Sequence, residues 1–166
     1  MKDIRKAAME TKSVHAGIGE YEYGAVVPPI YQTSTFKFEN VEHGADLFAG
    51  RGDGYIYTRM RNPTVEAMEN ALAVLENGAK GLGCGSGMAA IHTAFAATLK
   101  AGDHVVSSES VYGPTSTLLT TIIADFGVES TLVDTANLEA VRAAMSPNTR
   151  VVYVEIPVNP TLAISD

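Results

Sequence analysis

The sequence from residue 62 onward alternates between helix-like and strand-like segments, and this alternation restricts the fold more than any other feature. Asn62 is a good N-cap and Pro63 a favoured first residue for a helix that Gly78 would end. Beyond it we expect strands at 80–83, 104–107, 128–133 and 150–156, and helices at 88–100, 114–126 and 138–145. Because parallel strands need helical crossovers, the pattern predicts an α/β fold with a parallel or mixed sheet flanked by helices.

Residues 1–60 differ from this pattern and predict an extended arm. They contain a short helix at 41–49, which Asn40 would cap and Gly50 would end, but otherwise show no sustained period. The apolar side chains of such an arm need a surface on which to pack, either the following domain or a neighbouring subunit. We therefore expect an arm at 1–60 and the first part of an α/β domain at 61–166.

Charge and composition argue against several function classes. The net charge of −7 and the pI near 5.0 make nucleic acid or an anionic membrane an unfavourable main partner. No apolar run approaches the ~20 residues that span a bilayer, and the first residues are polar rather than leader-like. With a single cysteine, Cys84, the chain fits a reducing compartment, so we expect a cytoplasmic protein. We expect Cys84 itself to be buried in a tight turn.

The sequence GLGCGSGM at 81–88 is the strongest candidate for a ligand site. Glycines in a strand-to-helix turn let the backbone approach an anion, and Ser86 can cap the following helix. Three interpretations remain open. A dinucleotide-binding turn fits poorly because the glycine spacing differs. An S-adenosylmethionine-type loop would need an acidic residue such as Glu109, and a lone phosphate at the helix N-terminus needs nothing further.

Other candidates lie at the carboxyl ends of the expected strands, where parallel sheets bind ligands. Tyr112 could place its ring over a planar cofactor. Asn159 lies between prolines, which predicts an extended pose suited to one directed hydrogen bond. In the loop before the first regular helix, Arg59 could bind phosphate. The histidines are far apart in sequence, so we expect no metal site.

Several blocks of sequence, taken in order, resemble the Cys/Met-metabolism (transsulfuration) family of pyridoxal-phosphate (PLP) enzymes. The blocks are VHAG at 14–17, PIYQTST at 29–35, GYIYTR at 54–59, NPT at 62–64, SGMAAI at 86–91, VYG at 111–113 and EIPVNPT at 155–161. Within the family, the sequence looks most similar to methionine γ-lyase and cystathionine γ-lyase. The resemblance runs from about residue 11 to 166 and implies the first part of a fold-type I PLP-dependent transferase-like large domain.

The resemblance also implies roles for particular residues. The backbone N–H groups of Gly87 and Met88 would hold the cofactor phosphate. Tyr112 would be the catalytic residue, stacking on the pyridine ring and assisting proton transfer. Tyr57 and Arg59 would reach the phosphate of a neighbouring subunit. This arrangement implies a homo-oligomer, a dimer of dimers, with cofactor sites shared between subunits and an inter-subunit role for the arm.

Two further cofactor-site residues follow from the same comparison. Asn159 would contact the ring hydroxyl of the cofactor, with Glu155 as its structural support. The implied activity is that of a carbon–sulfur lyase acting on a small amino acid, methionine or cystathionine, by γ-elimination. Cystathionine γ-synthase and O-acylhomoserine sulfhydrylase are alternatives. Pro114 stands where many methionine γ-lyases have a cysteine, which weakens methionine as the substrate relative to cystathionine or homocysteine.

The family's chemistry also needs a lysine that binds the cofactor covalently and an aspartate that pairs with the pyridine nitrogen. Both would lie beyond Asp166, and no lysine of this chain has the family's lysine context. We therefore expect a fragment or a truncated product that is inactive alone. Alternatives of another class are an S-adenosylmethionine or nucleotide-binding domain and a non-catalytic fragment.

Overall fold

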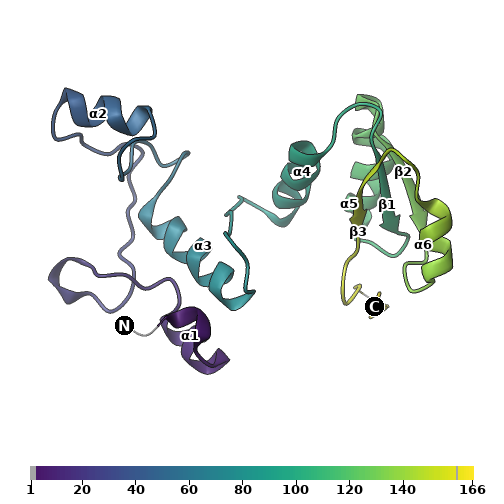
Figure 1. Ribbon diagram of the computed structural model, residues 1–166, viewed down its shortest axis with the longest axis horizontal. Coiled ribbons are helices and arrows are strands. Elements are labelled where there is room, and N and C mark those ends of the chain that lie inside the picture. The colour runs from purple at the N-terminus through teal and green to yellow at the C-terminus, as the bar shows by residue number, and fades with distance from the viewer. Residues whose placement is uncertain (1–2, 160) are drawn as a thin grey trace. The chain divides into compact units, whose positions relative to one another are not determined.

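A computed structural model describes residues 3–159 and 161–166 of the chain. The chain forms two compact units, Met1–Gly83 and Cys84–Asp166, and each is described here by itself (Figure 1). The division falls after Gly83 rather than near residue 60, because the helix that begins at Pro63 packs against the arm. The assignment of an inter-subunit arm and a cofactor domain stays a prediction.

The first unit contains three helices, α1 (Met9–His15), α2 (Val41–Phe48) and α3 (Pro63–Leu75), and two 3-10 turns, Ile4–Lys6 and Glu22–Gly24. Helix α1 was not expected from the sequence. It packs against α3, and Lys12 donates from Nζ to Asn77 Oδ1 over 3.2 Å. At Gly17, which has a φ of +75°, a Cβ atom would lie 2.1 Å from the Ala67 carbonyl oxygen. A short helix of this kind depends on tertiary packing, which a local period does not reveal.

Helices α2 and α3 begin as predicted. Asn40 Oδ1 accepts from His43 N over 2.7 Å, and Asn62 Oδ1 accepts from Thr64 N over 2.9 Å. The end of α3 differs from the prediction. Asn77, not Gly78, takes the left-handed conformation, with a φ of 53°. Asparagine tolerates that region better than most residues, so it can end a helix as glycine does.

The strand expected at 80–83 is absent from the described structure, so that prediction was wrong. The segment lies along α3 instead of pairing with another strand. Gly83 N–H donates to Glu69 Oε1 over 2.6 Å, and a Cβ atom at Gly81 would lie 2.5 Å from the Glu69 carbonyl oxygen. The small glycines therefore allow a close approach to a helix rather than a strand pairing.

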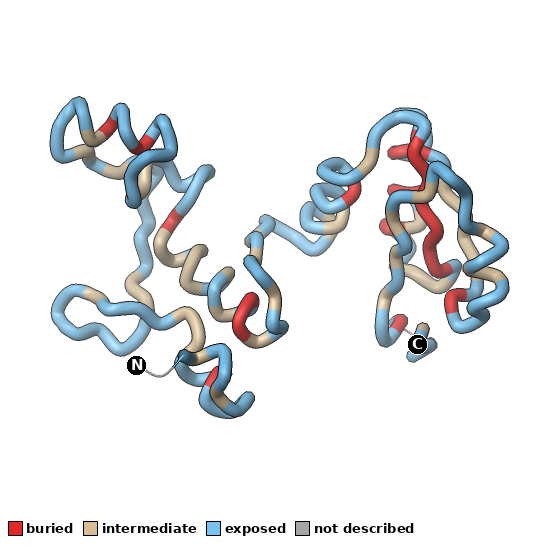
Figure 2. The backbone as a smooth tube through the Cα atoms, in the orientation of Figure 1, coloured by how far each residue is buried: buried red, intermediate tan, exposed pale blue. Residues whose placement is uncertain are grey.

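The second unit is an α/β fold with a parallel three-stranded sheet in the order β2-β1-β3. Its elements are α4 (Gly87–Thr98), β1 (His104–Ser108), α5 (Gly113–Thr117), β2 (Glu129–Val133), α6 (Leu138–Ala144) and β3 (Thr149–Tyr153). Every residue of the central strand β1 is buried, as Figure 2 shows in red. The α/β class and the parallel sheet are as predicted. Helix α4 ends two residues before the expected Lys100. Strand β3 ends at Tyr153, which pairs with Ser107, and therefore stops short of the end expected at residue 156.

The helix expected at 114–126 is divided into three helical pieces. After α5 comes a π-helical turn, Leu118–Ile122, and then a 3-10 turn, Ala124–Phe126, which Gly127 ends with a φ of 80°. The adjacent residues Leu118 and Leu119 of this turn both lie in the core, at 3% and 0% exposure. With them the core contains Phe95, Val105, Ile123 and Val128.

Within the described residues, no helix has the length and apolar character needed to cross a membrane.

Candidate functional site

The start of α4 presents free backbone donors. Ser86 Oγ accepts from Ala89 N over 3.1 Å, which is the predicted N-cap. The N–H groups of Gly87 and Met88 precede the first intrahelical bond and have no hydrogen-bond partner among the described residues. Apart from the adjoining residues and the backbone of the helix itself, no described atom lies within 4 Å of a Cβ placed at Gly85 or Gly87, so the space beside these donors is open. Such an end can accept an anion.

Tyr112 lies beyond the end of β1 and caps α5. Its backbone N–H donates to Glu155 Oε2 over 2.8 Å. Its carbonyl oxygen accepts from Thr115 N and Ser116 N over 2.8 and 3.0 Å. The tyrosine residue is 57% exposed, so its ring is available to a ligand.

Glu155 follows β3 and receives donors from both neighbouring elements. Besides the Tyr112 N–H, it accepts from Tyr153 Oη over 3.1 Å and from Thr115 Oγ1 over 3.3 Å. Burial, followed by the charge of Glu155 and the hydrogen bond to it, raises the pKa of Tyr153 to about 12. The carboxylate therefore has neutral donors that hold their protons at neutral pH.

Met88 joins the start of α4 to this arrangement, because Thr115 Oγ1 lies 3.9 Å from its sulfur. A cavity of about 640 Å³ opens beside it. The cavity is lined by Met88, His92, Gly113, Pro114, Thr117, Leu118 and Ile122. The second unit thus brings Gly87, Met88, Tyr112 and Glu155 to one end of the sheet.

Asn159 is exposed and lies in a turn, and its directed hydrogen bond to a ligand stays a prediction. Leu162 N–H closes the turn by donating to Val158 O over 2.6 Å. Val158 is 4% exposed and anchors the segment. Among the described residues, no hydrogen bond connects Asn159 with Glu155.

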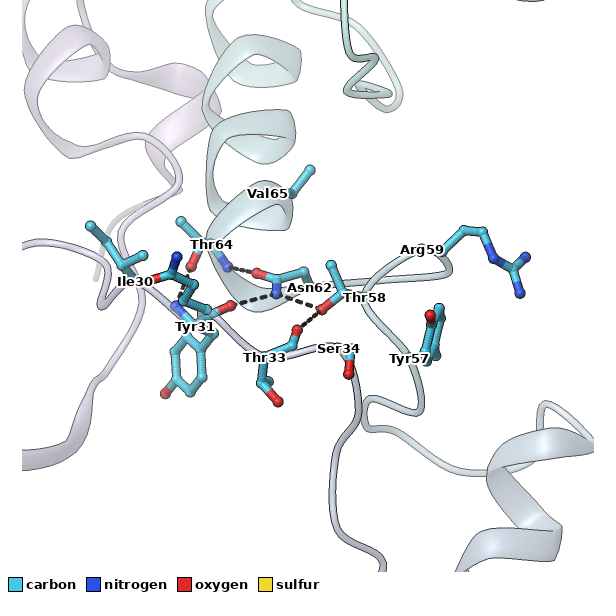
Figure 3. A pocket seen from close by; sticks show the side chains of 11 residues that line it. Ile30, Tyr31, Thr33, Ser34, Tyr57, Thr58, Arg59, Asn62, Thr64 and Val65 are labelled. Carbon is cyan, nitrogen blue, oxygen red and sulfur yellow. Dashed lines mark hydrogen bonds between the residues drawn. The ribbon is translucent and has the colours of Figure 1, made fainter.

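Tyr57 and Arg59 lie in the first unit and form a second group of candidate ligand-binding residues (Figure 3). The guanidinium of Arg59 lies 5.4 Å from the centre of the Tyr57 ring, and within the described chain it forms no ion pair. Tyr57 is 39% exposed. The pair is therefore available to a ligand or to another chain.

Asn62 holds the loop that carries this pair. The residue is 4% exposed, and its amide Nδ2 donates to Tyr31 O over 2.9 Å and to Thr58 Oγ1 over 3.0 Å, while its Oδ1 caps α3. Thr58 also donates from Oγ1 to Thr33 O. A cavity of about 840 Å³ opens here. It is lined by Ile30, Tyr31, Gln32, Thr33, Ser34, Tyr57, Thr58, Arg59, Asn62, Thr64 and Val65.

A cluster of Tyr55, Arg61 and Glu66 holds the two ends of the loop that carries Tyr57 and Arg59. Glu66 accepts from Tyr55 Oη over 2.6 Å and from Arg61 Nη2 over 2.7 Å, and Arg61 lies over the Tyr55 ring at 5.2 Å. The hydrogen bond from Tyr55 and then that from Arg61 lower the pKa of Glu66. Burial and the bond to Glu66 raise the pKa of Tyr55 to about 12. Sequence reasoning missed this cluster.

Two other expectations can be compared with the structure. Cys84 is exposed, so the expectation of a buried residue was wrong. The glycines around it leave its side chain without covering atoms. No cluster of histidine, cysteine and carboxylate side chains suited to a metal ion occurs among the described residues.

Comparison with known proteins agrees with this geometry. Residues 10–166 match the family described as "Cys/Met metabolism PLP-dependent enzyme". The chain belongs to this family. Its members depend on PLP, so the predicted cofactor is confirmed for the family.

The family members to which this chain is similar are named for different activities. The L-methionine gamma-lyase of Fusobacterium nucleatum subsp. nucleatum is 49% identical over 99% of this chain and 42% of its own length. The cystathionine gamma-lyase of Bacillus subtilis is 44% identical over 95% of this chain and 39% of its own length. The crystal structure of a putative O-acetylhomoserine (thiol)-lyase from Campylobacter jejuni matches with a TM-score of 0.91 at 33% identity. That match covers 97% of this chain and 40% of the other. The chain thus spans about 40% of the length of these relatives.

The second unit fits the phosphate end of PLP. The open space at Gly87 and the unpartnered N–H groups of Gly87 and Met88 suit an anion, and the exposed Tyr112 ring suits a planar partner. Sequence reasoning missed Thr115 and Tyr153, which complete the surroundings of Glu155. The signal was a spacing, because Thr115 follows Tyr112 by three residues, about one helical turn, and Tyr153 precedes Glu155 by two residues, which puts two side chains on the same side of an extended segment.

Proposed function

We propose that the chain forms part of a PLP-dependent carbon–sulfur lyase that removes a thiol from a sulfur amino acid by γ-elimination. The observation that carries the proposal is the grouping in the second unit. There, the free donors of α4 and the Tyr112 loop meet at the carboxyl end of the parallel sheet. Family membership supports the same cofactor.

Each residue has a proposed role. The N–H groups of Gly87 and Met88 bind the cofactor phosphate, and Tyr112 covers the ring and holds or moves a proton at Oη. Asn159 binds the ring hydroxyl. When bound, PLP supplies an electron-withdrawing ring that stabilises negative charge on the amino-acid substrate.

Tyr57 and Arg59 are proposed to bind the phosphate held by a neighbouring subunit, in a homo-oligomer arranged as a dimer of dimers. The unpaired guanidinium supports this role, because arginine binds phosphate through charge-assisted hydrogen bonds. We propose the arm as the element that carries this pair to the neighbour.

The substrate is proposed to be methionine or cystathionine, as the names of similar relatives suggest. A replacement reaction of the synthase or sulfhydrylase kind is the second candidate. The similarity to the putative O-acetylhomoserine (thiol)-lyase of C. jejuni favours it. Pro114, which lines the cavity beside Met88, bears instead on the choice of substrate and favours cystathionine over methionine. Full-length protein incubated with methionine, with cystathionine, or with an O-acylated homoserine plus sulfide or cysteine separates these reactions. Elimination releases a thiol, ammonia and a keto acid, whereas replacement releases the carboxylic acid of the acyl group and forms homocysteine or cystathionine without a keto acid.

Arg59→Ala tests the cofactor site. Loss of a charged phosphate partner should weaken PLP retention by about tenfold or more, read from the visible absorbance of the protein after gel filtration. Arg51→Ala is the matched control, because Arg51 forms an exposed ion pair with Asp46. Equal retention in the two variants would remove Arg59 from the site.

A mixing experiment tests whether the site is shared. Arg59→Ala and Tyr112→Phe subunits are each expected to have low activity. Once mixed and reassembled, heterodimers would contain one intact site, so activity should recover to about a quarter of the wild-type value. Absence of recovery, with heterodimers present by mass, would contradict a shared site.

A further inference from the structure

Glu155 accepts hydrogen bonds from residues at or just beyond the carboxyl ends of two strands of the second unit, β1 and β3. Its carboxylate accepts from a backbone donor at Tyr112 and from the hydroxyl groups of Thr115 and Tyr153. These donors belong to the loop after β1, to α5 and to β3. One half-buried side chain therefore connects all three.

The carboxylate is held by hydrogen bonds rather than by an opposite charge. No ion pair to Glu155 occurs within the described residues. A carboxylate that accepts several neutral donors is directional, because each donor must point at an oxygen lone pair. Such an arrangement specifies a loop conformation.

Tyr112 depends on this arrangement because little else holds it. The residue is 57% exposed, so packing does not fix the ring. Its backbone is held on both sides, the N–H by Glu155 and the carbonyl by the first turn of α5. The direction in which the side chain leaves the backbone follows from these bonds.

We infer that Glu155 is a positioning residue for Tyr112: its carboxylate fixes the Tyr112 backbone at the joined ends of β1 and β3 and so aims the tyrosine at the ligand beside Met88. The inference rests on the proposed function insofar as Tyr112 acts on the cofactor. The expectation that Glu155 supports Asn159 stays a separate prediction.

Two variants of the full-length protein separate the effect of the Glu155 hydrogen bonds from the effect of its negative charge. In Glu155→Gln the amide oxygen can accept from Tyr112 N–H, and the amide N–H₂ can donate to the two hydroxyls, so the arrangement is kept. In Glu155→Ala it is lost. Glu129→Ala is the control, because Glu129 is exposed at the opposite end of the sheet.

Hydrogen exchange at the Tyr112 amide is the first readout and needs no cofactor. Exchange should be about tenfold or more faster in Glu155→Ala and nearly unchanged in Glu155→Gln and in the control. The second readout is kinetic. In Glu155→Ala, kcat should fall by about tenfold with a smaller change in KM, and Glu155→Gln should restore it.

The outcomes are distinct. Unchanged exchange in Glu155→Ala would overturn the inference, and so would equal loss in the glutamine and alanine variants. Faster exchange with unchanged kcat would show that the anchor does not position a catalytic group, and would also overturn it. If wild-type protein bound no PLP, the proposed function would fail, whereas the exchange comparison would still report on the anchor.

Discussion

The two units of the chain are stabilised in different ways. The second unit buries a continuous apolar core around β1, with Val105, Val106 and Leu119 at 0% exposure. The first unit leaves large apolar side chains in solvent, among them Val26 at 80% and Ile30 at 83%. Its segments are connected by side chains such as Asn62 and Glu66. The difference teaches that a unit can have a defined loop geometry without a large core, provided that buried polar groups are paired.

The largest expected effect is at the core of the second unit. Leu119→Ala removes a fully buried side chain and should lower the free energy of unfolding by about 3 kcal/mol. Urea denaturation followed by circular dichroism measures it. Leu72→Ala in α3 is the matched control, because Leu72 is 49% exposed, and should cost about 1 kcal/mol. Equal losses would contradict the contrast between the units.

The next effect concerns the first unit. Asn62→Ala removes the cap of α3 and the two amide bonds to the arm, so we expect a loss of about 2 kcal/mol. Asn137→Ala is the control, because Asn137 caps α6 through Glu139 N and Ala140 N only, and should cost about 1 kcal/mol. The same denaturation assay applies. A smaller loss at Asn62 than at Asn137 would show that the arm is held by other contacts.

Acid should weaken the first unit through Glu66. Its pKa is lowered in the folded protein from 4.5, so its stabilising contribution is present above pH 4.5 and is lost as pH falls through the folded pKa. Glu66→Gln should therefore flatten the decline in stability below that pH. Glu139→Gln, which breaks only an exposed ion pair, should keep the wild-type decline. Parallel pH curves for wild type and Glu66→Gln would contradict this role.

The smallest expected effect is the raised pKa of one tyrosine in each unit. Tyr55 in the first and Tyr153 in the second should ionise near pH 12, whereas an ordinary tyrosine ionises near 10.0. The raised pKa values mean that this stabilisation is complete below pH 10 and is lost as pH rises through about 12. Ultraviolet titration should show the ionisation of these two tyrosines near pH 12. Tyr55→Phe should remove one, and two remaining late groups would contradict the assignment.

Much of the fold follows from local sequence. The caps at Asn40, Asn62 and Ser86 lie where their side chains predicted, because N-capping is a short-range interaction. The parallel pairing of β1 with β3 likewise follows from the alternation of strand-like and helix-like segments in the sequence. Helix α1 and the path of residues 80–83 were missed, since each depends on contacts with helix α3. The π-helical turn was also missed, because the apolar pattern of residues 114–126 is that of an ordinary helix.

The candidate site divides in the same way. Sequence blocks pointed to Tyr112 and Glu155, but only the structure shows that the Glu155 carboxylate receives the Tyr112 N–H, 43 residues away in sequence. Asn159 lies in a turn beside the buried Val158, and no hydrogen bond among the described residues connects it with Glu155. Residue identity predicts which chemistry is present, whereas the pairing of donors and acceptors requires the tertiary fold.

The three hydrogen bonds of Asn62 have a mechanical consequence. One amide joins the first turn of α3 to Tyr31 and to Thr58, the neighbour of Arg59 in sequence. The place of the Arg59 backbone is therefore defined by the start of helix α3 as well as by its own loop, so a substitution at Asn62 affects the helix and the phosphate-binding candidate together.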